Sequence, residues 1–381
     1  MTTGPGGRLQ EDERLMARAL ELAATTDFAT SPNPMVGALV VGDGRVVGMG
    51  ATSPPGGPHA EVHALRDAGE AARGATLYVT LEPCSHQGRT PPCVGPIIEA
   101  GIRRCVVAMA DPNPRVDGAG IAALRSAGIE VDTGILESRA RRLNQFYVRW
   151  VTSGLPFVTA KFAMSLDGRI ATHTGESKWI TSESARAHVQ ILRHQHDVIL
   201  VGANTVARDD PNLTTRLPGG GGRQPLRVVL DSRLRVPVDA RIFTAQTGEV
   251  LVATSDRARG DRIREFEAAG IPLHVFPARE GRVGVGDVLR HLAATERISV
   301  LIEGGSAVLG SAFDAGLVDR VVAVIAPRVI GGLEAPAAVG GRGVDVLAAS
   351  QPLRDVEVER VGPDIVVTGY CVRDTPHQDG Q

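Results

Sequence analysis

Short β-rich runs alternate with helical segments along most of this chain, and this alternation restricts its fold more than any other feature. Two β-rich runs, 35–41 and 45–51, flank a Gly-Asp-Gly sequence whose residues readily take positive φ, so they predict a hairpin. Short buried strands are expected at 76–81, 105–110 and 129–132, with helices between them. The alternation predicts an α/β fold, in which helices cover the faces of a sheet.

The pattern breaks around 150–156, where Thr-Ser-Gly-Leu-Pro predicts a joint between two domains. A chain of 381 residues is long enough for two domains of ordinary size. We therefore expect a flexible N-terminus over 1–10, a first domain over 11–152, a second domain over 153–373 and a flexible tail over 374–381.

Strand and helix patterns also alternate after the joint, so the second domain is expected to be α/β as well. Its strands are expected to begin at Phe157 and to continue at 197–201, 227–231, 250–254, 272–276, 298–302 and 319–325, before an antiparallel pair at 356–361 and 364–372. The helices expected in the whole chain lie at 11–28, 59–68, 95–100, 120–127, 183–194, 258–269, 285–294 and 306–315.

The charge and cysteine content exclude several classes of protein. Lysine and arginine number 41 against 43 aspartate and glutamate residues, so the chain has no general attraction to nucleic acid or to an anionic membrane. No segment approaches 18 uninterrupted apolar residues, and 1–8 lacks the apolar run of a signal peptide. Four cysteines are too few for a disulfide scaffold and fit a reducing compartment. We expect a cytoplasmic protein without nucleic-acid or membrane partners.

Four residues in the first domain have the types and order of a catalytic zinc site. His59 and Glu61 stand in a His-x-Glu sequence, and Cys84 follows a proline and precedes Cys93 by eight intervening residues. Zinc favours imidazole and thiolate ligands, and a catalytic site keeps its fourth position for water. A nearby carboxylate that is not a ligand can move the water's proton. The pattern predicts a zinc deaminase, although the general signature has only two residues between its cysteines.

Simpler interpretations exist for each part of this pattern. A His-x-Glu sequence on a helix is common, and two cysteines can be ordinary buried thiols. A structural zinc site would need a fourth protein ligand, for which His63, on the same helical face as His59, is the nearby candidate. His86, between the cysteines, is a candidate substrate contact. The order of all the parts together favours catalysis.

The loop from Cys84 to Cys93 reads Cys-Ser-His-Gln-Gly-Arg-Thr-Pro-Pro-Cys, with Asn-Pro-Met-Val-Gly at 33–37 before it and Asp-Pro-Asn-Pro at 111–114 after it. In these motifs the chain resembles the bifunctional riboflavin-biosynthesis deaminase–reductases. The resemblance implies a cytidine-deaminase-like three-layer domain that deaminates 2,5-diamino-6-ribosylamino-4(3H)-pyrimidinone 5′-phosphate. It further implies zinc ligands at His59, Cys84 and Cys93, a proton donor at Glu61 and a pyrimidine contact at Asn33.

In the second domain the residues alone predict less. Glu303-Gly304-Gly305-Ser306 lies between an expected strand and an expected helix, where backbone N–H groups can hold a phosphate. A tight connection without a ligand is the simpler alternative. The four glycines at 219–222 are most simply a surface loop.

The resemblance extends through the motifs at 161–169, 175–181 and 209–216. It implies a dihydrofolate-reductase-like α/β domain that uses NADPH to reduce the opened ribosyl group to ribityl. The implied substrate contacts are Ser177, Arg193, Leu213, Arg216 and Glu303. The implied cofactor contacts are Ala163, Trp179, Thr205, Asp209, Gly305, Ser306, Ala307, Val308, Leu309, Gly310 and Ser311.

Chemistry supports part of this assignment. Arginine makes bidentate contacts with phosphate, so Arg193 and Arg216 are the expected ligands of the substrate's 5′-phosphate. Lys161 and Asp209 are candidate proton or hydrogen-bond partners in the reduction. The sequence does not assign the cation that reads the 2′-phosphate of NADPH. A homodimer is expected from the resemblance alone.

Three other functions remain open at this point. A nucleoside or tRNA-base deaminase with an appended non-catalytic domain would need a basic surface, which the balanced charge does not favour. A structural-zinc interaction module would need the fourth ligand. The second half could also be a degenerate domain that does not bind NADPH.

Overall fold

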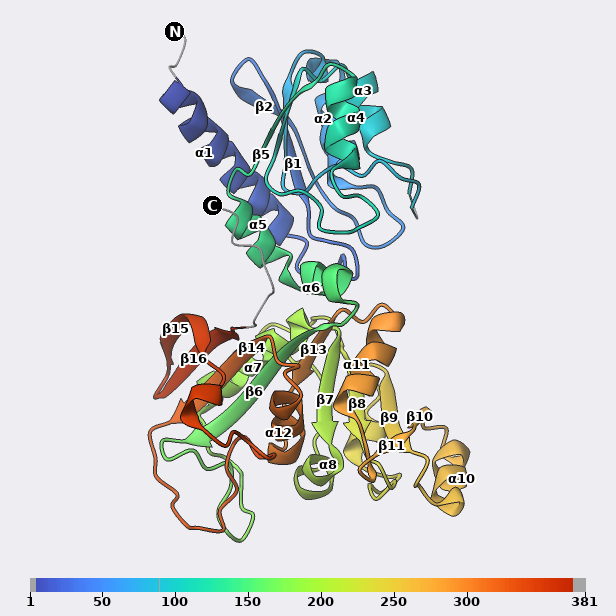
Figure 1. Cartoon of the computed structure of the whole chain (residues 1–381), viewed down its shortest axis with the longest axis vertical. Helices are drawn as coiled ribbons and strands as arrows, with labels where there is room; N and C mark the ends of the chain where they lie inside the picture. Colours follow the sequence, from blue (N-terminus) through green and yellow to red (C-terminus); the bar gives the residue numbers. More distant parts are fainter. Residues whose placement is uncertain (1–4, 89, 373–381) are drawn as a thin grey trace. The chain divides into compact units, whose positions relative to one another are not determined.

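The computed structural model describes residues 5–88 and 90–372 and divides the chain into two compact units, 1–155 and 156–381 (Figure 1). The division falls within the segment 150–156. Each unit is built around its own main sheet, with helices on its faces. In the described part of the chain, no helix is long and apolar enough to cross a membrane.

The sheet of the first unit has the strand order β2-β1-β3-β4-β5. β1 runs antiparallel to both β2 and β3, whereas β3, β4 and β5 are mutually parallel. The predicted hairpin is confirmed, because β1 and β2 pair directly across the Gly-Asp-Gly turn. These strands are β1 (Gly37–Gly42), β2 (Arg45–Ala51), β3 (Thr76–Val79), β4 (Arg104–Val107) and β5 (Glu130–Thr133).

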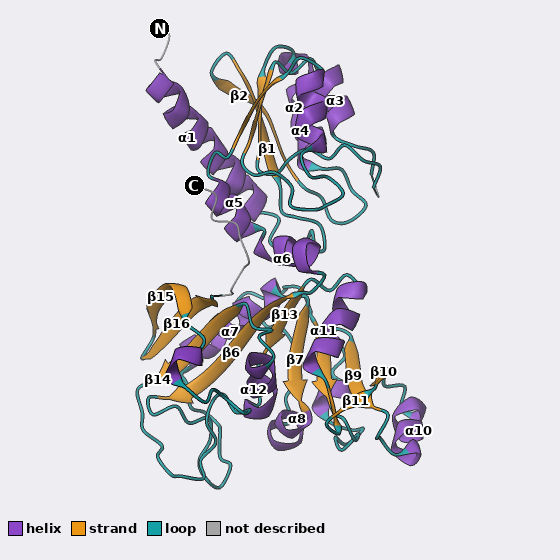
Figure 2. Ribbon diagram, in the orientation of Figure 1, coloured by secondary structure: helices purple, strands orange, loops and turns teal. Residues whose placement is uncertain are grey.

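Helices cover both faces of this sheet. α1 and α5 lie on one side, and α2, α3 and α4 lie on the other, which gives the expected three layers (Figure 2). The helices are α1 (Pro5–Ala24), α2 (Ala60–Ala68), α3 (Val94–Glu99), α4 (Ala119–Ser126), α5 (Glu137–Leu143) and α6 (Gln145–Ser153), with a 3₁₀ turn at Gly69–Ala72.

Glycines let α2 approach the sheet closely. A Cβ atom on Gly48 would lie 2.3 Å from the carbonyl oxygen of Ala64, and one on Gly50 would lie 2.4 Å from that of Ala60. Real Cβ atoms do not come so close to backbone, so larger residues would push the helix away. The glycines of β2 therefore allow α2 to pack directly against the sheet.

The second unit has a nine-stranded sheet in the order β10-β9-β8-β7-β13-β6-β14-β16-β15. Its strands are parallel from β10 to β14, and β16 and β15 then add an antiparallel edge, as the sequence predicted. The strands are β6 (Phe157–Ser165), β7 (Val198–Gly202), β8 (Leu226–Leu230), β9 (Val250–Ser255), β10 (Leu273–Phe276), β13 (Ser299–Ile302), β14 (Arg320–Ala326), β15 (Leu353–Val361) and β16 (Asp364–Cys371), with a small hairpin of β11 (Ala278–Arg279) and β12 (Arg282–Val283).

Helices cover both faces of the second sheet as well. Residues of α7, α8 and α10 join one buried cluster with alternate strand residues such as Ile199 and Val201. α11 and α12 contact each other and lie in front of the sheet in Figure 2, with α7 behind it. The helices are α7 (Glu183–Gln195), α8 (Ala203–Asp209), α9 (Arg241–Thr244), α10 (Gly260–Ala268), α11 (Val285–Ala294) and α12 (Ser306–Asp314), with a 3₁₀ turn at Leu347–Ala349.

The structure differs from the sequence prediction at the N-terminus and at the joint. α1 begins at Pro5, so it includes residues 5–10 of the expected flexible N-terminus, since proline is well accommodated in a first helical turn. α6 runs through Trp150 to Ser153, and the residue that caps it, Gly154, adopts a φ of 68°. α5, α6, α8 and α9 were not predicted, and three of them are only four to seven residues long. The expected tail at 374–381 and residues 1–4 lie outside the described residues.

Candidate active sites

Three metal-binding side chains come together in the first unit. His59 Nδ1 lies 3.1 Å from Cys93 Sγ and 3.6 Å from Cys84 Sγ, and the ligand atoms of all three lie within 4.8 Å of one another. His59 immediately precedes α2 and Cys93 immediately precedes α3, so the starts of two helices meet here. One imidazole and two thiols are donors that zinc prefers, with a fourth position left for water.

Hydrogen bonds orient these ligands. His59 Nε2 lies 3.0 Å from Thr90 Oγ1, so the ring turns its Nδ1 atom toward the thiols. A hydrogen bond at the other ring nitrogen fixes the tautomer of a metal-binding histidine. The hydrogen bond from the Cys93 thiol, followed by that from His59, lowers the pKa of Cys84 to about 4. A low pKa favours the thiolate, which is the form that binds metal.

Glu61 is the acidic group at this site. It is the second residue of α2, and only 4% of it is exposed. Burial raises the pKa of its carboxyl group, which also hydrogen-bonds with the Cys93 side chain. A carboxyl group with a raised pKa can hold a proton and release it beside the ligands.

Three other residues considered for this site do not join the ligands. The ring of His63 lies 2.8 Å from Ser53 Oγ, so it does not supply the fourth ligand that a structural zinc site requires. His86 is exposed. Asn33 is half-buried in the turn before β1, where its backbone amide donates to the carbonyl of Thr30.

Sequence reasoning missed a buried carboxyl group in this unit. Asp111 is 7% exposed and accepts a hydrogen bond of 3.0 Å from the Tyr147 hydroxyl. Burial raises its pKa, and the charge of His86 acts in the opposite direction. The neighbouring loop is held by Glu82, whose carboxylate accepts hydrogen bonds from the amides of Asp111 and Gly120. The Asp-Pro-Asn-Pro motif was the only sequence signal for this group.

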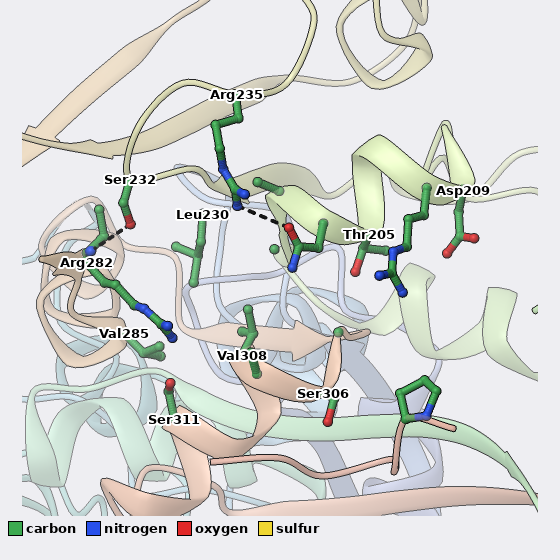
Figure 3. A pocket seen from close by; sticks show the side chains of 18 of the residues that line it. Thr205, Asp209, Leu230, Ser232, Arg235, Arg282, Val285, Ser306, Val308 and Ser311 are labelled. Atoms are coloured by element: carbon green, nitrogen blue, oxygen red, sulfur yellow. Dashed lines mark hydrogen bonds between the residues drawn. The ribbon is translucent and has the colours of Figure 1, made fainter. Parts of the chain in front are cut away.

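Two cavities lie at the carboxyl ends of parallel strands in the second unit. We call them the Arg193 cavity, of about 620 Å³, and the Ser306 cavity, of about 790 Å³ (Figure 3). Both volumes are within the range of about 300–1,000 Å³ typical of ligand pockets. Four residues line both cavities, so the two spaces adjoin: Ile170, Ser177, Thr205 and Asp209.

All five residues expected to contact substrate line the Arg193 cavity. They come from several separate elements, and four of the expected cofactor contacts line it as well: Ala163, Trp179, Thr205 and Asp209. The five are Ser177, Arg193, Leu213, Arg216 and Glu303. The structure therefore gathers residues that are scattered in the sequence.

Arg193 and Glu303 form a buried ion pair. Arg193 Nε and Nη2 donate to the two carboxylate oxygens of Glu303 at 2.6 and 2.8 Å, and Nη1 donates to the carbonyl of Thr214. Burial alone would raise the pKa of Glu303, but the charge and hydrogen bonds of Arg193 outweigh it and keep the pKa below its usual value. The charge of Arg193 is therefore neutralised within the protein, whereas Arg216 is exposed.

Lys161 presents an amino group to the same cavity. It lies on β6, and burial lowers its pKa, while the charge of Glu303 acts in the opposite direction. Within the described parts of the chain, its ammonium group has no hydrogen-bond or ion-pair partner. Asp209, which accepts a hydrogen bond from Ser177 Oγ at 3.0 Å, stands where the two cavities meet. Both groups are placed to contact a molecule bound there.

Most of the glycine-rich turn after β13 lines the Ser306 cavity. Gly304 has a φ of 128°, which side chains rarely allow, and Gly305 precedes α12, so bare backbone meets a helix N-terminus here. The expected cofactor contacts that line this cavity are Thr205, Asp209, Gly305, Ser306, Ala307, Val308 and Ser311.

Two of the expected cofactor contacts pack the protein instead. Leu309 is 1% exposed and lies in the core. A Cβ atom on Gly310 would lie 2.2 Å from the carbonyl carbon of Gly340, so this glycine lets α12 approach another backbone segment. Neither residue lines either cavity, because both belong to the inward side of α12.

The structure also adds lining residues that sequence reasoning missed. Lys178 and Arg186 line the Arg193 cavity, and the guanidinium group of Arg186 lies 4.4 Å from the centre of the Trp179 ring. The Ser306 cavity gains Ser232 and four arginines, Arg208, Arg233, Arg235 and Arg282. Lys178 lies within the motif at 175–181, whereas no motif distinguished the other residues from ordinary surface side chains.

Comparisons with known proteins agree with both halves of this description. Residues 9–109 match the model of the cytidine and deoxycytidylate deaminase zinc-binding region, and residues 156–367 match that of the RibD C-terminal domain. The riboflavin biosynthesis protein RibD of Bacillus amyloliquefaciens is 46% identical over 360 residues, which are 94% of this chain and 95% of that protein.

Solved structures show the same relationship over the whole chain. The RibD structure from Acinetobacter baumannii (form 1) is 36% identical, with a TM-score of 0.86, and the match covers 96% of this chain and 100% of that one. A Thermotoga maritima protein described as a diaminohydroxyphosphoribosylaminopyrimidine deaminase/5-amino-6-(5-phosphoribosylamino)uracil reductase is also 36% identical, with a TM-score of 0.83 and the same coverage. This chain belongs to the RibD family of bifunctional riboflavin-biosynthesis enzymes, with a zinc-dependent deaminase domain followed by an NADPH-dependent reductase domain.

Proposed function

We propose that the first unit deaminates 2,5-diamino-6-ribosylamino-4(3H)-pyrimidinone 5′-phosphate and that the second unit then reduces the ribosyl group of the product to ribityl. The observation that carries the first step is the convergence of His59, Cys84 and Cys93 beside buried Glu61. The description of the Thermotoga maritima relative supports the substrate.

In the deamination, His59, Cys84 and Cys93 hold zinc. Zinc bound by this donor set supplies a water whose pKa is lowered to about 7, so that it is a nucleophile at neutral pH. Glu61 takes a proton as the C–O bond forms, and it returns a proton to the amino group as the C–N bond breaks and ammonia leaves. Asn33 and His86 are proposed to contact the substrate beside the zinc ligands.

In the reduction, NADPH supplies a hydride to the sugar carbon of the ring-opened substrate. Hydride addition to this carbon leaves a negative charge on the atom that was double-bonded to it, and that atom takes a proton. We propose that Lys161 or Asp209, two of the titratable groups that line the Arg193 cavity, donates this proton. Arg216 is proposed to bind the 5′-phosphate, while the ion pair of Arg193 with Glu303 shapes the cavity wall. Thr205 and Asp209, which line both cavities, would hold the nicotinamide end of the cofactor next to the substrate.

Two finer proposals concern the setting of the enzyme. We propose that it works in the cytoplasm, since four cysteines fit a reducing compartment. We also expect no nucleic-acid or membrane partners, since the net charge is only -2. We also propose a homodimer, supported by the edge strand β15, on which Val356 and Val358 are 51% and 68% exposed. Analytical ultracentrifugation tests this proposal, since a monomer at micromolar concentration would contradict it.

The decisive test uses the zinc-loaded protein and the diaminopyrimidine ribosyl phosphate, with products identified by mass. Without NADPH we expect only replacement of one amino group by oxygen, and with NADPH the addition of two hydrogens to that product. Ammonia release from cytidine or tRNA, but not from this substrate, would favour a nucleoside or tRNA-base deaminase. Deamination without reduction would make the second unit a non-catalytic partner.

A further inference from the structure

A further cavity lies in the first unit, apart from both catalytic sites. Its volume is about 510 Å³, within the range of about 300–1,000 Å³ typical of ligand pockets. Its walls come from α1, the β1–β2 hairpin, the turn before β3 and the residue before β4. We call it the Arg73 cavity, and its charged and hydroxyl-bearing lining residues are Glu11, Asp43, Arg73, Thr76, Tyr78 and Arg103.

This cavity lies at the end of the sheet opposite to the zinc ligands. Thr76, which begins β3, lines the cavity, whereas Cys84 follows the other end of that strand. In the same way, His59 immediately precedes α2, whereas Ala71, in the 3₁₀ turn after that helix, lines the cavity. None of the zinc ligands lines it, and neither does Glu61. A molecule bound there therefore takes no part in the deamination.

Two arginines of this cavity have no partner. Arg73 and Arg103 are exposed, and neither side chain forms an ion pair or a hydrogen bond with any residue that the structure describes. Three other arginines of the same unit, Arg8, Arg14 and Arg104, each donate to a carboxylate. Unpaired guanidinium groups around a cavity favour an anionic ligand.

The backbone holds these two arginines at the starts of neighbouring strands. β3 and β4 pair in parallel from Thr76 and Arg104 onward. Just before this pairing, the amide of Arg103 donates to the carbonyl of Ala75 at 3.0 Å, and Arg73 lies two residues before Ala75. Both guanidinium groups line the same cavity, so they can contact the same anion.

The two acidic lining residues differ in their availability to a ligand. Glu11 is already engaged, since Arg14 Nε and Nη2 donate to its two carboxylate oxygens at 3.0 and 2.6 Å. Asp43, in the hairpin turn, is exposed and has no ion-pair or hydrogen-bond partner for its carboxylate among the described residues. Its carboxylate can accept hydrogen bonds from hydroxyl groups of a ligand.

The charges beneath the cavity are neutralised within the protein. The hydroxyl of Tyr78 donates to Asp12 Oδ1 at 2.6 Å, and Arg104 Nη1 and Nη2 donate to the two oxygens of Asp12 at 2.8 and 2.7 Å. The free charges at the cavity are therefore two guanidinium groups and one carboxylate. This set suits a phosphate ester that also carries hydroxyl groups, because arginine binds phosphate and the carboxylate accepts from hydroxyls.

We infer that the Arg73 cavity binds a small phosphate ester of a polyol, with its phosphate on Arg73 and Arg103 and a hydroxyl group on Asp43. This site is separate from the zinc site and from both cavities of the second unit. The ligand is therefore neither the substrate nor the cofactor of the two proposed reactions, and the inference does not depend on them.

The test measures binding of glycerol 3-phosphate, inorganic phosphate and glycerol by isothermal titration calorimetry. The full-length protein is loaded with zinc, saturated with NADPH and carries Arg216→Ala, which removes the proposed phosphate ligand of the reductase. In this parent protein, glycerol 3-phosphate should bind more tightly than inorganic phosphate, and glycerol should not bind.

Variants of the parent protein then locate the site. Arg73→Ala and Arg103→Ala should each weaken glycerol 3-phosphate binding about 10-fold or more through loss of a charged hydrogen bond. Asp43→Gly, in which glycine accommodates the φ of 49°, should remove the advantage of glycerol 3-phosphate over inorganic phosphate. Arg66→Ala, an exposed arginine of α2 outside the cavity, is the matched control and should bind as the parent does.

The inference is overturned if the Arg73 and Arg103 variants, shown to be folded by an unchanged melting temperature, bind glycerol 3-phosphate as tightly as the Arg66 variant. It is also overturned if the parent protein binds no glycerol 3-phosphate at millimolar concentration. Equal affinity of the parent protein for glycerol 3-phosphate and inorganic phosphate would overturn the choice of a polyol ester.

Discussion

The two sites of this chain are built in opposite ways. The deaminase site draws its metal ligands and its carboxylate from two short motifs, placed by the starts of α2 and α3. The reductase site is spread over strand ends and loops from β6 to α12, and its walls are two adjoining cavities. Replacing one residue of the compact metal site should therefore abolish its activity. Replacing one residue of the distributed reductase site should cause only a partial loss of affinity or stability.

The largest expected effect is the loss of a metal ligand. Cys84→Ser should abolish ammonia release and lower the zinc content of the purified protein, because a serine hydroxyl is a poor zinc ligand compared with a thiolate. NADPH oxidation with the deaminated substrate should continue. Metal analysis and the two half-reactions measure this.

Cys105→Ser is the matched control for that change. Cys105 is fully buried on β4 but lies outside the ligand group, so this variant should keep its zinc. Loss of zinc in the control, or retention of both zinc and ammonia release in Cys84→Ser, would contradict the assignment of the ligands.

The sequence predicted the deaminase site better than the reductase site, because the deaminase site comes from two short motifs and the reductase site is spread over many elements. His59, Glu61, Cys84 and Cys93 are reactive residue types whose spacing carries chemical meaning without knowledge of the fold. Arg235 and Arg282 are ordinary residues on exposed loops, and only the folded cavity shows that they face the same space. Residue types alone therefore could not identify them.

The fold, too, could be predicted only where a local sequence pattern indicates it. The hairpin, the buried strands and the longer helices were predicted because their hydrophobic periodicity is local. Short helices such as α8 and α9 carry too few residues for a periodic signal. Gly310 was expected to contact the cofactor from the resemblance alone, but its packing depends on the distant Gly340, which no local pattern indicates.

The second largest effect is expected from breaking the buried ion pair of the reductase unit. Glu303→Ala should lower the free energy of unfolding of that unit by about 3–5 kcal/mol, because it leaves Arg193 buried without its partner. Thermal unfolding followed by calorimetry measures the change. Glu265→Ala, which removes the partner of Arg262 at an exposed pair, should cost no more than about 1 kcal/mol. Equal losses in the two variants would argue against a special role for the buried pair.

A smaller effect is expected from the proposed phosphate ligand. Arg216→Ala should raise the KM of the reductase for its phosphorylated substrate about 10- to 100-fold through loss of a charged hydrogen bond, with little change in kcat. Steady-state kinetics of NADPH oxidation checks this. The exposed Arg257 lies outside both cavities, so Arg257→Ala should leave KM unchanged. An unchanged KM in Arg216→Ala would remove this residue from the phosphate site.

The smallest effect distinguishes packing from cofactor binding on α12. Gly310→Ala should destabilise the protein by about 1–3 kcal/mol, because the new methyl group overlaps the backbone at Gly340. NADPH affinity of the folded protein should not change. In the matched control Gly286→Ala, the nearest atom to the new methyl group is Arg290 Nη1 at 3.7 Å, and no loss is expected. A weaker NADPH affinity in Gly310→Ala without loss of stability would return Gly310 to the cofactor site.

The central claim is that two independent sites act in sequence, and Glu61→Gln tests it most directly. This variant should keep its zinc but release ammonia about 10²–10⁴-fold more slowly, since the group that moves the proton is gone. It should oxidise NADPH at the wild-type rate when given the deaminated substrate, and not when given the diaminopyrimidine. Equal NADPH oxidation with both substrates, or loss of both reactions, would contradict the account.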